Sequence, residues 1–218
     1  MKKAASHPRR SKDEVKHEAI LKAATRLFLK HGYSATSMDA IAESARVTKQ
    51  TVYAHYKSKD ALFEHILSHL CEKHTASEQL LALSNRNMEE GLFAIGLAFL
   101  NMVTHSEVLA MTRLVISESG QHPKLAKRYY DGGTQRIVSL LAELLGHYKK
   151  RGQLNVADTN SAASYFIAML KGQYYIRMIL GIKPTPAPRD KELHVRESVR
   201  VFMKVYADAN PLQTRSSL

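Results

Sequence analysis

Apolar residues recur every three or four positions along most of the chain, which is the period of an amphipathic helix. No stretch sustains an alternation of apolar and polar residues, and no Asn-Gly or Asp-Gly pair joins two β-branched runs. The pattern therefore predicts an all-α fold of about nine helices. Their expected ranges are 13–31, 36–45, 49–56, 58–83, 89–104, 106–119, 123–151, 158–181 and 190–208.

Residues 36–61 carry the most informative pattern. Two hydroxyl residues precede an apolar stripe formed by Met38, Ile41, Ala42 and Ala45. Arg46 and Val47 then interrupt the helix, and Thr48 is placed to cap a second short helix whose inward residues are Val52 and Tyr56. Two short helices joined by a tight turn are typical of a helix-turn-helix that enters the major groove of DNA. With the preceding helix they would form a three-helix DNA-binding head.

The outer face of this unit carries side chains suited to DNA. Lys and Gln hydrogen-bond base edges, whereas Thr, Tyr and His commonly hold phosphate oxygens. DNA contacts are therefore predicted for Thr36, Ser37, Arg46, Thr48, Lys49, Gln50, Thr51, Tyr53, His55 and Lys59. The alternative is that the two helices only pack a core, as in many proteins that never bind DNA.

The same segment resembles the TetR family of bacterial one-component regulators, from Glu14 to about Cys71. The residues that match the family pattern are Thr36, Ile41, Ala42, Ala45, Val47, Thr48, Tyr53, Tyr56, Lys59, Asp60 and Leu62. Tyr56 stands where the family usually has Phe, and Gln50 stands where it often has Gly. The side chain of Gln50 is therefore a candidate for reading a base.

A net charge of +12 and a pI near 9.7 favour a polyanionic partner such as double-stranded DNA. The first twelve residues carry five cations and no acid, so this arm either follows the phosphates or is a solvated tail. The expected division is a basic arm at 1–12, a DNA-binding domain at 13–57, a helical ligand-binding and dimerisation domain at 58–210 and a tail at 211–218.

The second half resembles the C-terminal domains of AefR-like or AcrR-like regulators, through residues 113–118, 152–154 and the helix that contains Gly172. This resemblance implies a homodimer formed by the last two helices of each subunit and a pocket for a small ligand. The apolar stripes available for the dimer are Leu193, Val195, Val199, Phe202 and Met203, with Tyr165, Phe166, Met169 and Leu170. Packing within one subunit is the alternative for such stripes.

Met and aromatic side chains adapt to irregular apolar ligands, and they suggest where the pocket would lie. The candidate lining residues are Phe93, Leu97, Leu100, Met102, Met111, Phe166, Met169, Gln173, Tyr174 and Arg177. Each is also consistent with ordinary core packing, because pocket linings and cores share one composition.

Other chemistry is weakly marked. His65 and His69 lie one helical turn apart near Glu72 and His74, but such a pair usually faces solvent, so no metal and no cofactor is predicted. Phosphate loops, HExxH, GxSxG and paired CxxC motifs are absent from the sequence, and a non-enzymatic role is expected. A single cysteine and no signal peptide favour the cytoplasm. The sequence has no run of about 18 apolar residues, so no membrane partner is expected.

These features predict a homodimeric, ligand-responsive transcriptional regulator. Its expected activity is to repress transcription by binding a palindromic operator, until a small apolar or amphipathic effector releases it. Two alternatives remain: an activator or nucleoid-like DNA binder without an inducer, and a helical small-molecule-binding protein that does not bind DNA.

Overall fold

The computed structural model describes residues 11–74, 87–182 and 185–207, and in these ranges the elements are helices apart from one bridge between Leu154 and Ala207. The elements are α1 (Lys12–His31), α2 (Met38–Ala45), α3 (Lys49–His55), α4 (Lys59–His74), α6 (Met88–Val103), α7 (Ser106–Glu118), α8 (Pro123–Tyr129), the π-helix η1 (Tyr130–Gln135), α9 (Arg136–Lys150), α10 (Thr159–Ile179) and α11 (Pro188–Tyr206). Because α8, η1 and α9 follow one another without a break, the described part has the nine predicted helices. The all-α prediction is confirmed.

Local capping explains where the first helices begin. Ser11 and Glu14 form a reciprocal capping box at the start of α1. Ser37, Thr48 and Ser58 each accept a hydrogen bond from the backbone N–H three residues ahead. These hydroxyls satisfy N–H groups that have no partner within the helix, so the short helices start where the sequence predicts. Most of the basic arm, the C-terminal tail and the end of the helix predicted at 58–83 lie outside the described residues.

Two helices depart from regular α geometry. The segment Tyr130–Gln135 winds as a π-helix around two adjacent glycines. The predicted helix 158–181 is broken at Gly172, whose φ of 46° and ψ of −157° are not helical and favour glycine. At the break His194 Nε2 lies 3.1 and 3.0 Å from the carbonyl oxygens of Met169 and Leu170. The helix period alone indicated neither feature.

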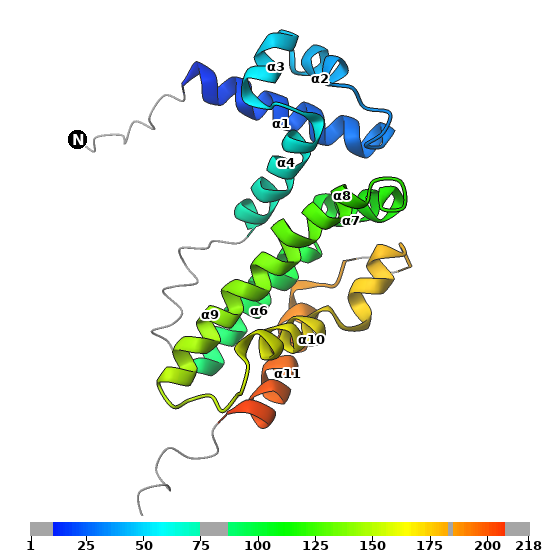
Figure 1. The fold of residues 1–218 in the computed structure, drawn as a ribbon. Helices are drawn as coiled ribbons and strands as arrows, with labels where there is room; N and C mark the ends of the chain where they lie inside the picture. Colours follow the sequence, from blue (N-terminus) through cyan, green and yellow to red (C-terminus); the bar gives the residue numbers. More distant parts are fainter. Residues whose placement is uncertain (1–10, 75–86, 183–184, 208–218) are drawn as a thin grey trace, which may run out of the picture.

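The described residues form two hydrophobic cores, and Figure 1 shows the arrangement of the helices that contribute to them. One joins α1–α4 to α7 and α8, and its buried residues include Ile20, Phe28, Ile41, Phe63 and Leu114. The other lies among α6, α9, α10 and α11, and its buried residues include Leu92, Leu141, Leu145, Phe166 and Phe202. Helix α4 runs from the head toward the second half, which places it between the two parts.

No single helix in the described ranges is long and apolar enough to cross a membrane. Only α6 and α7 taken together reach the required length and composition, and these two are bent by 64°.

Candidate DNA-binding surface and ligand pocket

The second helix of the helix-turn-helix, α3, is anchored on one side and exposed on the other. Val52 is fully buried, whereas Lys49, Gln50 and Tyr53 are exposed. Lys49 Nζ lies 2.8 Å from Asp39 Oδ1 of α2, which ties the two helices together beside the exposed face. The turn before α3 is made by Arg46, whose φ of 56° is left-handed, and its side chain is exposed. Ser37, Arg46, Thr48, Lys49, Gln50, Thr51 and Tyr53 all keep at least partial access to solvent.

Three residues predicted to contact DNA are engaged inside the head instead. Thr36 is only 3% exposed, and its hydroxyl donates to the carbonyl of Gly32 over 2.8 Å. The side chain of His55 is 16% exposed, and its Nε2 lies 3.4 Å from Asp13 Oδ1. Lys59 donates to backbone carbonyls. The geometry therefore gives these three residues contacts within the head, whereas the sequence predicted contacts with DNA for them.

Lys59 holds the loop between α1 and α2 against the start of α4. Its Nζ lies 2.8, 3.2 and 3.0 Å from the carbonyl oxygens of Tyr33, Ser34 and Thr36, so all three ammonium N–H groups have acceptors. The same ammonium lies 4.5 Å from the centre of the Tyr33 ring, and the Tyr33 hydroxyl donates to Asp60. Burial lowers the pKa of Lys59, and the carboxylates of Asp60 and Glu118 partly oppose that effect.

The head is bonded to the second half through Glu118 at the end of α7. Its carboxylate accepts from the Tyr33 N–H over 3.0 Å and from the Ser34 hydroxyl over 2.8 Å. Burial alone would raise the pKa of Glu118, but the hydrogen bonds from Ser34 and Tyr33 and the nearby His122 lower it overall. Earlier in α7, Arg113 donates to the carbonyls of Ile179 and Met178. Helix α7 thus connects the head to the end of α10.

A histidine cluster that the sequence analysis missed lies where α1, α3 and α4 meet. The ring centre of His17 is 4.9 Å from that of His65 and 5.9 Å from that of His55. The Tyr56 hydroxyl lies 3.1 Å from His17 Nδ1. Burial and then the neighbouring histidines, led by His65, lower the pKa of His17. Within the described residues no group of three or more His, Cys, Asp or Glu side chains could hold a metal ion, and the side chains of residues 71–74 lie outside them.

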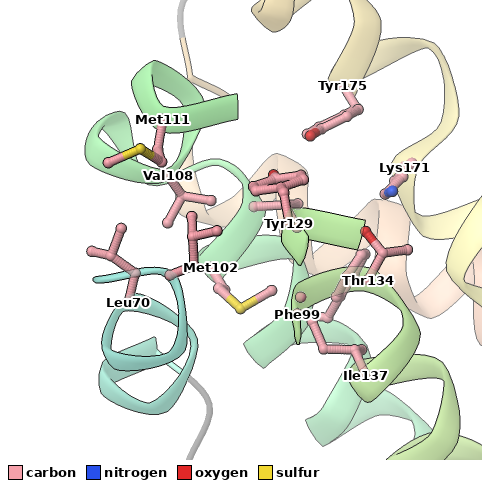
Figure 2. A pocket seen from close by; sticks show the side chains of 13 residues that line it. Leu70, Phe99, Met102, Val108, Met111, Tyr129, Thr134, Ile137, Lys171 and Tyr175 are labelled. Carbon is pink, nitrogen blue, oxygen red and sulfur yellow. The ribbon is translucent and has the colours of Figure 1, made fainter. Parts of the chain in front are cut away.

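A cavity lies beside α4 (Figure 2). Its walls come from α4, α6, α7, α8, η1, α9 and α10, and the lining residues are Leu67, Leu70, Phe99, Met102, Val103, Val108, Met111, Tyr129, Gly133, Thr134, Ile137, Lys171 and Tyr175. It encloses about 50 Å³. Ligand pockets for drug-sized molecules span about 300–1,000 Å³, so the cavity is nearly closed in this state.

Of the ten residues predicted to line a pocket, Met102 and Met111 line this cavity. The others lie elsewhere: Leu100 and Phe166 are buried in the core, Phe93, Leu97 and Met169 pack against it, Gln173 and Tyr174 are exposed, and Arg177 faces Gln173 at 3.4 Å. The polar residues of the lining include Thr134, Lys171 and Tyr175 in place of Gln173 and Arg177. Gly172 was the signal in the sequence that could have pointed to Lys171 as a lining residue, because the helix breaks at this glycine, directly after Lys171.

The predicted dimer stripes divide into a buried and an exposed set. Val195, Val199, Phe202, Phe166 and Leu170 are buried within the chain, which corrects their assignment to a dimer surface. The exposed apolar residues of α10 and α11 include Tyr165, Leu193, Val201 and Val205. Leu193, Val201 and Val205 are spaced by eight and four residues, so they share one face of α11.

Two family models cover the two halves of this architecture. Residues 20–66 match the model of bacterial regulatory proteins of the tetR family, and residues 90–208 match that of the AefR-like transcriptional repressor C-terminal domain. The chain belongs to the TetR family. Among its relatives is YhgD of Bacillus subtilis, an uncharacterised HTH-type transcriptional regulator. It is 32% identical over 178 residues, which are 79% of this chain and 87% of YhgD.

Solved TetR-family structures share the fold. A regulator from Mesorhizobium loti superposes with a TM-score of 0.79 at 27% identity, over 91% of this chain and 100% of the other. The flavonoid-responsive regulator FrrA superposes with a TM-score of 0.74 at 29% identity, over 89% of this chain and 98% of FrrA. This TetR-family chain is therefore a helix-turn-helix transcriptional regulator, and its relatives are regulators, not enzymes.

Proposed function

We propose that this regulator is a homodimeric repressor that binds a palindromic operator and releases it when a small apolar or amphipathic effector fills the cavity. The observation that carries the proposal is that α4, the helix leading out of the DNA-binding head, supplies Leu67 and Leu70 to the cavity wall. A molecule that enters the cavity must therefore press on the helix that positions the head. The AefR-like family model is described as that of a transcriptional repressor, and FrrA is named as flavonoid-responsive, which supports the proposal.

The proposed DNA contacts are the exposed residues of the helix-turn-helix. Gln50 would read a base edge from α3, while Lys49, Tyr53 and Thr51 hold phosphates or neighbouring bases. Near the starts of the two short helices, Ser37, Arg46 and Thr48 would contact the sugar-phosphate backbone of the DNA. Bacterial DNA lies in the cytoplasm, so the proposal places the protein there.

A dimer would present two such helices to successive major grooves, about 34 Å apart. The exposed apolar face of α10 and α11, which includes Tyr165, Leu193, Val201 and Val205, is the proposed interface. A twofold dimer uses the same patch on both copies, so one self-complementary face is sufficient.

The small volume of the cavity explains how an effector would release the operator. About 50 Å³ is room for roughly one or two water molecules, so an effector binds only if the walls separate. Effector binding then favours a state in which α4 has moved and the spacing of the two α3 helices no longer fits the operator. A molecule that bound both states equally would not change operator affinity.

Selection of bound duplexes from a random pool at near-physiological salt tests the proposal, followed by sedimentation of the protein with the selected DNA. One enriched palindrome bound by two copies is the expected result. Binding of every duplex with a steep loss at higher salt would indicate a general DNA binder and contradict the proposal. Failure to bind any duplex would favour a ligand-binding protein that does not act on DNA.

A further inference from the structure

Lys171 is a cation in the cavity wall for which the described residues supply no acidic partner. Lys171 lies on α10 directly before the break at Gly172, and no hydrogen bond or ion pair joins it to another residue in the described ranges. Its Nζ lies 5.2 Å from the centre of the Tyr175 ring. The ammonium is thus placed against an aromatic face and the cavity, with no carboxylate close enough to balance its charge.

This placement is unfavourable for the protein without a ligand. Burial lowers the pKa of Lys171, because an ammonium that has lost part of its water is harder to keep charged. A partly buried charge without a partner is typical of binding sites, where a ligand completes the missing interaction.

Two further polar groups of the wall, the hydroxyls of Thr134 and Tyr175, lie on the same side as Lys171, whereas the hydroxyl of the lining residue Tyr129 is already hydrogen-bonded to Thr112 of α7. Figure 2 shows Lys171, Thr134 and Tyr175 toward one side, and Leu70, Val108 and Met111 toward the other. The Thr134 and Tyr175 hydroxyls are further donors to an anion, whereas the residues from α4 and α7 offer only apolar contacts. The cavity is therefore polar and cationic at its α10 and η1 end and apolar at its α4 and α7 end.

We propose that the effector is an organic acid whose carboxylate or similar anionic group binds beside Lys171, while its apolar body extends toward α4. The inference rests on the proposed function in taking this cavity as the effector site. It also assigns a direction to the ligand: the acid fixes one end at α10, and the apolar end separates Leu67 and Leu70 from the opposite wall.

Three eight-carbon probes differ only in their head group and test the assignment: octanoate, 1-octanol and octylamine. Their binding to the full-length protein without DNA is measured by isothermal titration calorimetry. Octanoate is expected to bind at least about tenfold more tightly than 1-octanol, because its carboxylate accepts a charge-assisted hydrogen bond from the Lys171 ammonium. Octylamine should bind most weakly, because it brings a second cation to Lys171.

Variants of Lys171 separate the effect of its charge on ligand binding from any effect on the fold. Lys171→Met keeps the length of the side chain and should remove the preference for octanoate over 1-octanol, while Lys171→Arg should retain it. Lys150→Met, at an exposed position on α9, is the matched control and should bind all three probes as the parent does. Circular dichroism and the melting temperature of each variant check that the fold is kept.

Equal affinity of the parent for octanoate and 1-octanol would overturn the proposal, as would failure of octanoate to bind or an unchanged acid preference in Lys171→Met. The two proposals fail in different ways. If the protein binds octanoate but no DNA duplex, the proposed repressor function is refuted and the proposed acid-binding site is retained. If 1-octanol releases the operator and octanoate does not, the proposed acid-binding site is refuted and the proposed repressor function is retained.

Discussion

Replacing Lys59 with Met removes the one donor that the carbonyls of Tyr33, Ser34 and Thr36 share. Two of these contacts are half-buried and at 3.0 Å or less, and the third is exposed and longer. A hydrogen bond from a charged group contributes about 1.5–3 kcal/mol, and an ammonium over an aromatic ring adds about 0.5–1 kcal/mol. Part of this sum is offset by the burial that lowers the pKa of Lys59. We expect Lys59→Met to lower the free energy of unfolding by about 2–3 kcal/mol.

Urea denaturation followed by circular dichroism measures this loss, with Lys57→Met as the control because Lys57 is exposed and lies two residues earlier, in the loop before α4. The midpoint should fall for Lys59→Met and stay unchanged for Lys57→Met, with the same slope in both. Operator affinity should decline for Lys59→Met with the salt dependence of the parent. A variant of native stability whose binding has a shallower salt dependence would show that Lys59 holds a phosphate, and the structural reasoning would be refuted.

Three other changes probe the recognition helix, the histidine cluster and the dimer face. Gln50→Ala should cost about 1–3 kcal/mol of operator binding and relax one base position, and equal weakening on all sequences in a binding-site selection would refute base reading. The pKa of His17 is lowered below 6.5, so the unfolded chain takes up a proton there before the folded chain does. Stability should therefore fall as the pH drops through 6.5 toward the lowered value, and His17→Gln should reduce this loss in denaturation midpoints taken from about pH 7 to 5. An identical pH profile for the variant would exclude His17 as the cause. Val205→Glu on the exposed face of α11 should convert dimer to monomer in sedimentation equilibrium, whereas Ile116→Glu on α7, at similar exposure, should not. Dissociation by both or by neither would contradict the proposed interface.

Helix positions could be predicted from the sequence because they depend on nearby residues. A hydroxyl before an apolar stripe caps the helix through the backbone three residues ahead, and Ser37, Thr48 and Ser58 do so. The neighbouring Thr36 shows the limit of this reasoning. It has the same chemistry as Ser37, but its hydroxyl turns back to Gly32, which only the path of the α1–α2 loop decides.

The cavity and the dimer face depend on contacts between distant segments. The helical period predicts that Val195 and Val199 face inward, but it cannot tell whether α6 or a second subunit covers them. Lys171 is a charged residue in a helix, which is typical of a solvent-facing position, but it lines the cavity directly before the break at Gly172. Of the residues that the sequence pattern assigned to a pocket, only Met102 and Met111 therefore lie in the lining of this cavity.

The core of the DNA-binding head continues into α7 and α8, where Met111, Leu114 and Leu125 complete it. A chimera that joined residues 11–57 to the body of another regulator would leave Ile20 and Phe28 facing a foreign surface, and it would lose the Glu118 carboxylate that holds Tyr33 and Ser34. Transplanting the head would thus reduce its stability. Exchanging only the exposed side chains of α3 would change operator preference while keeping this shared core intact.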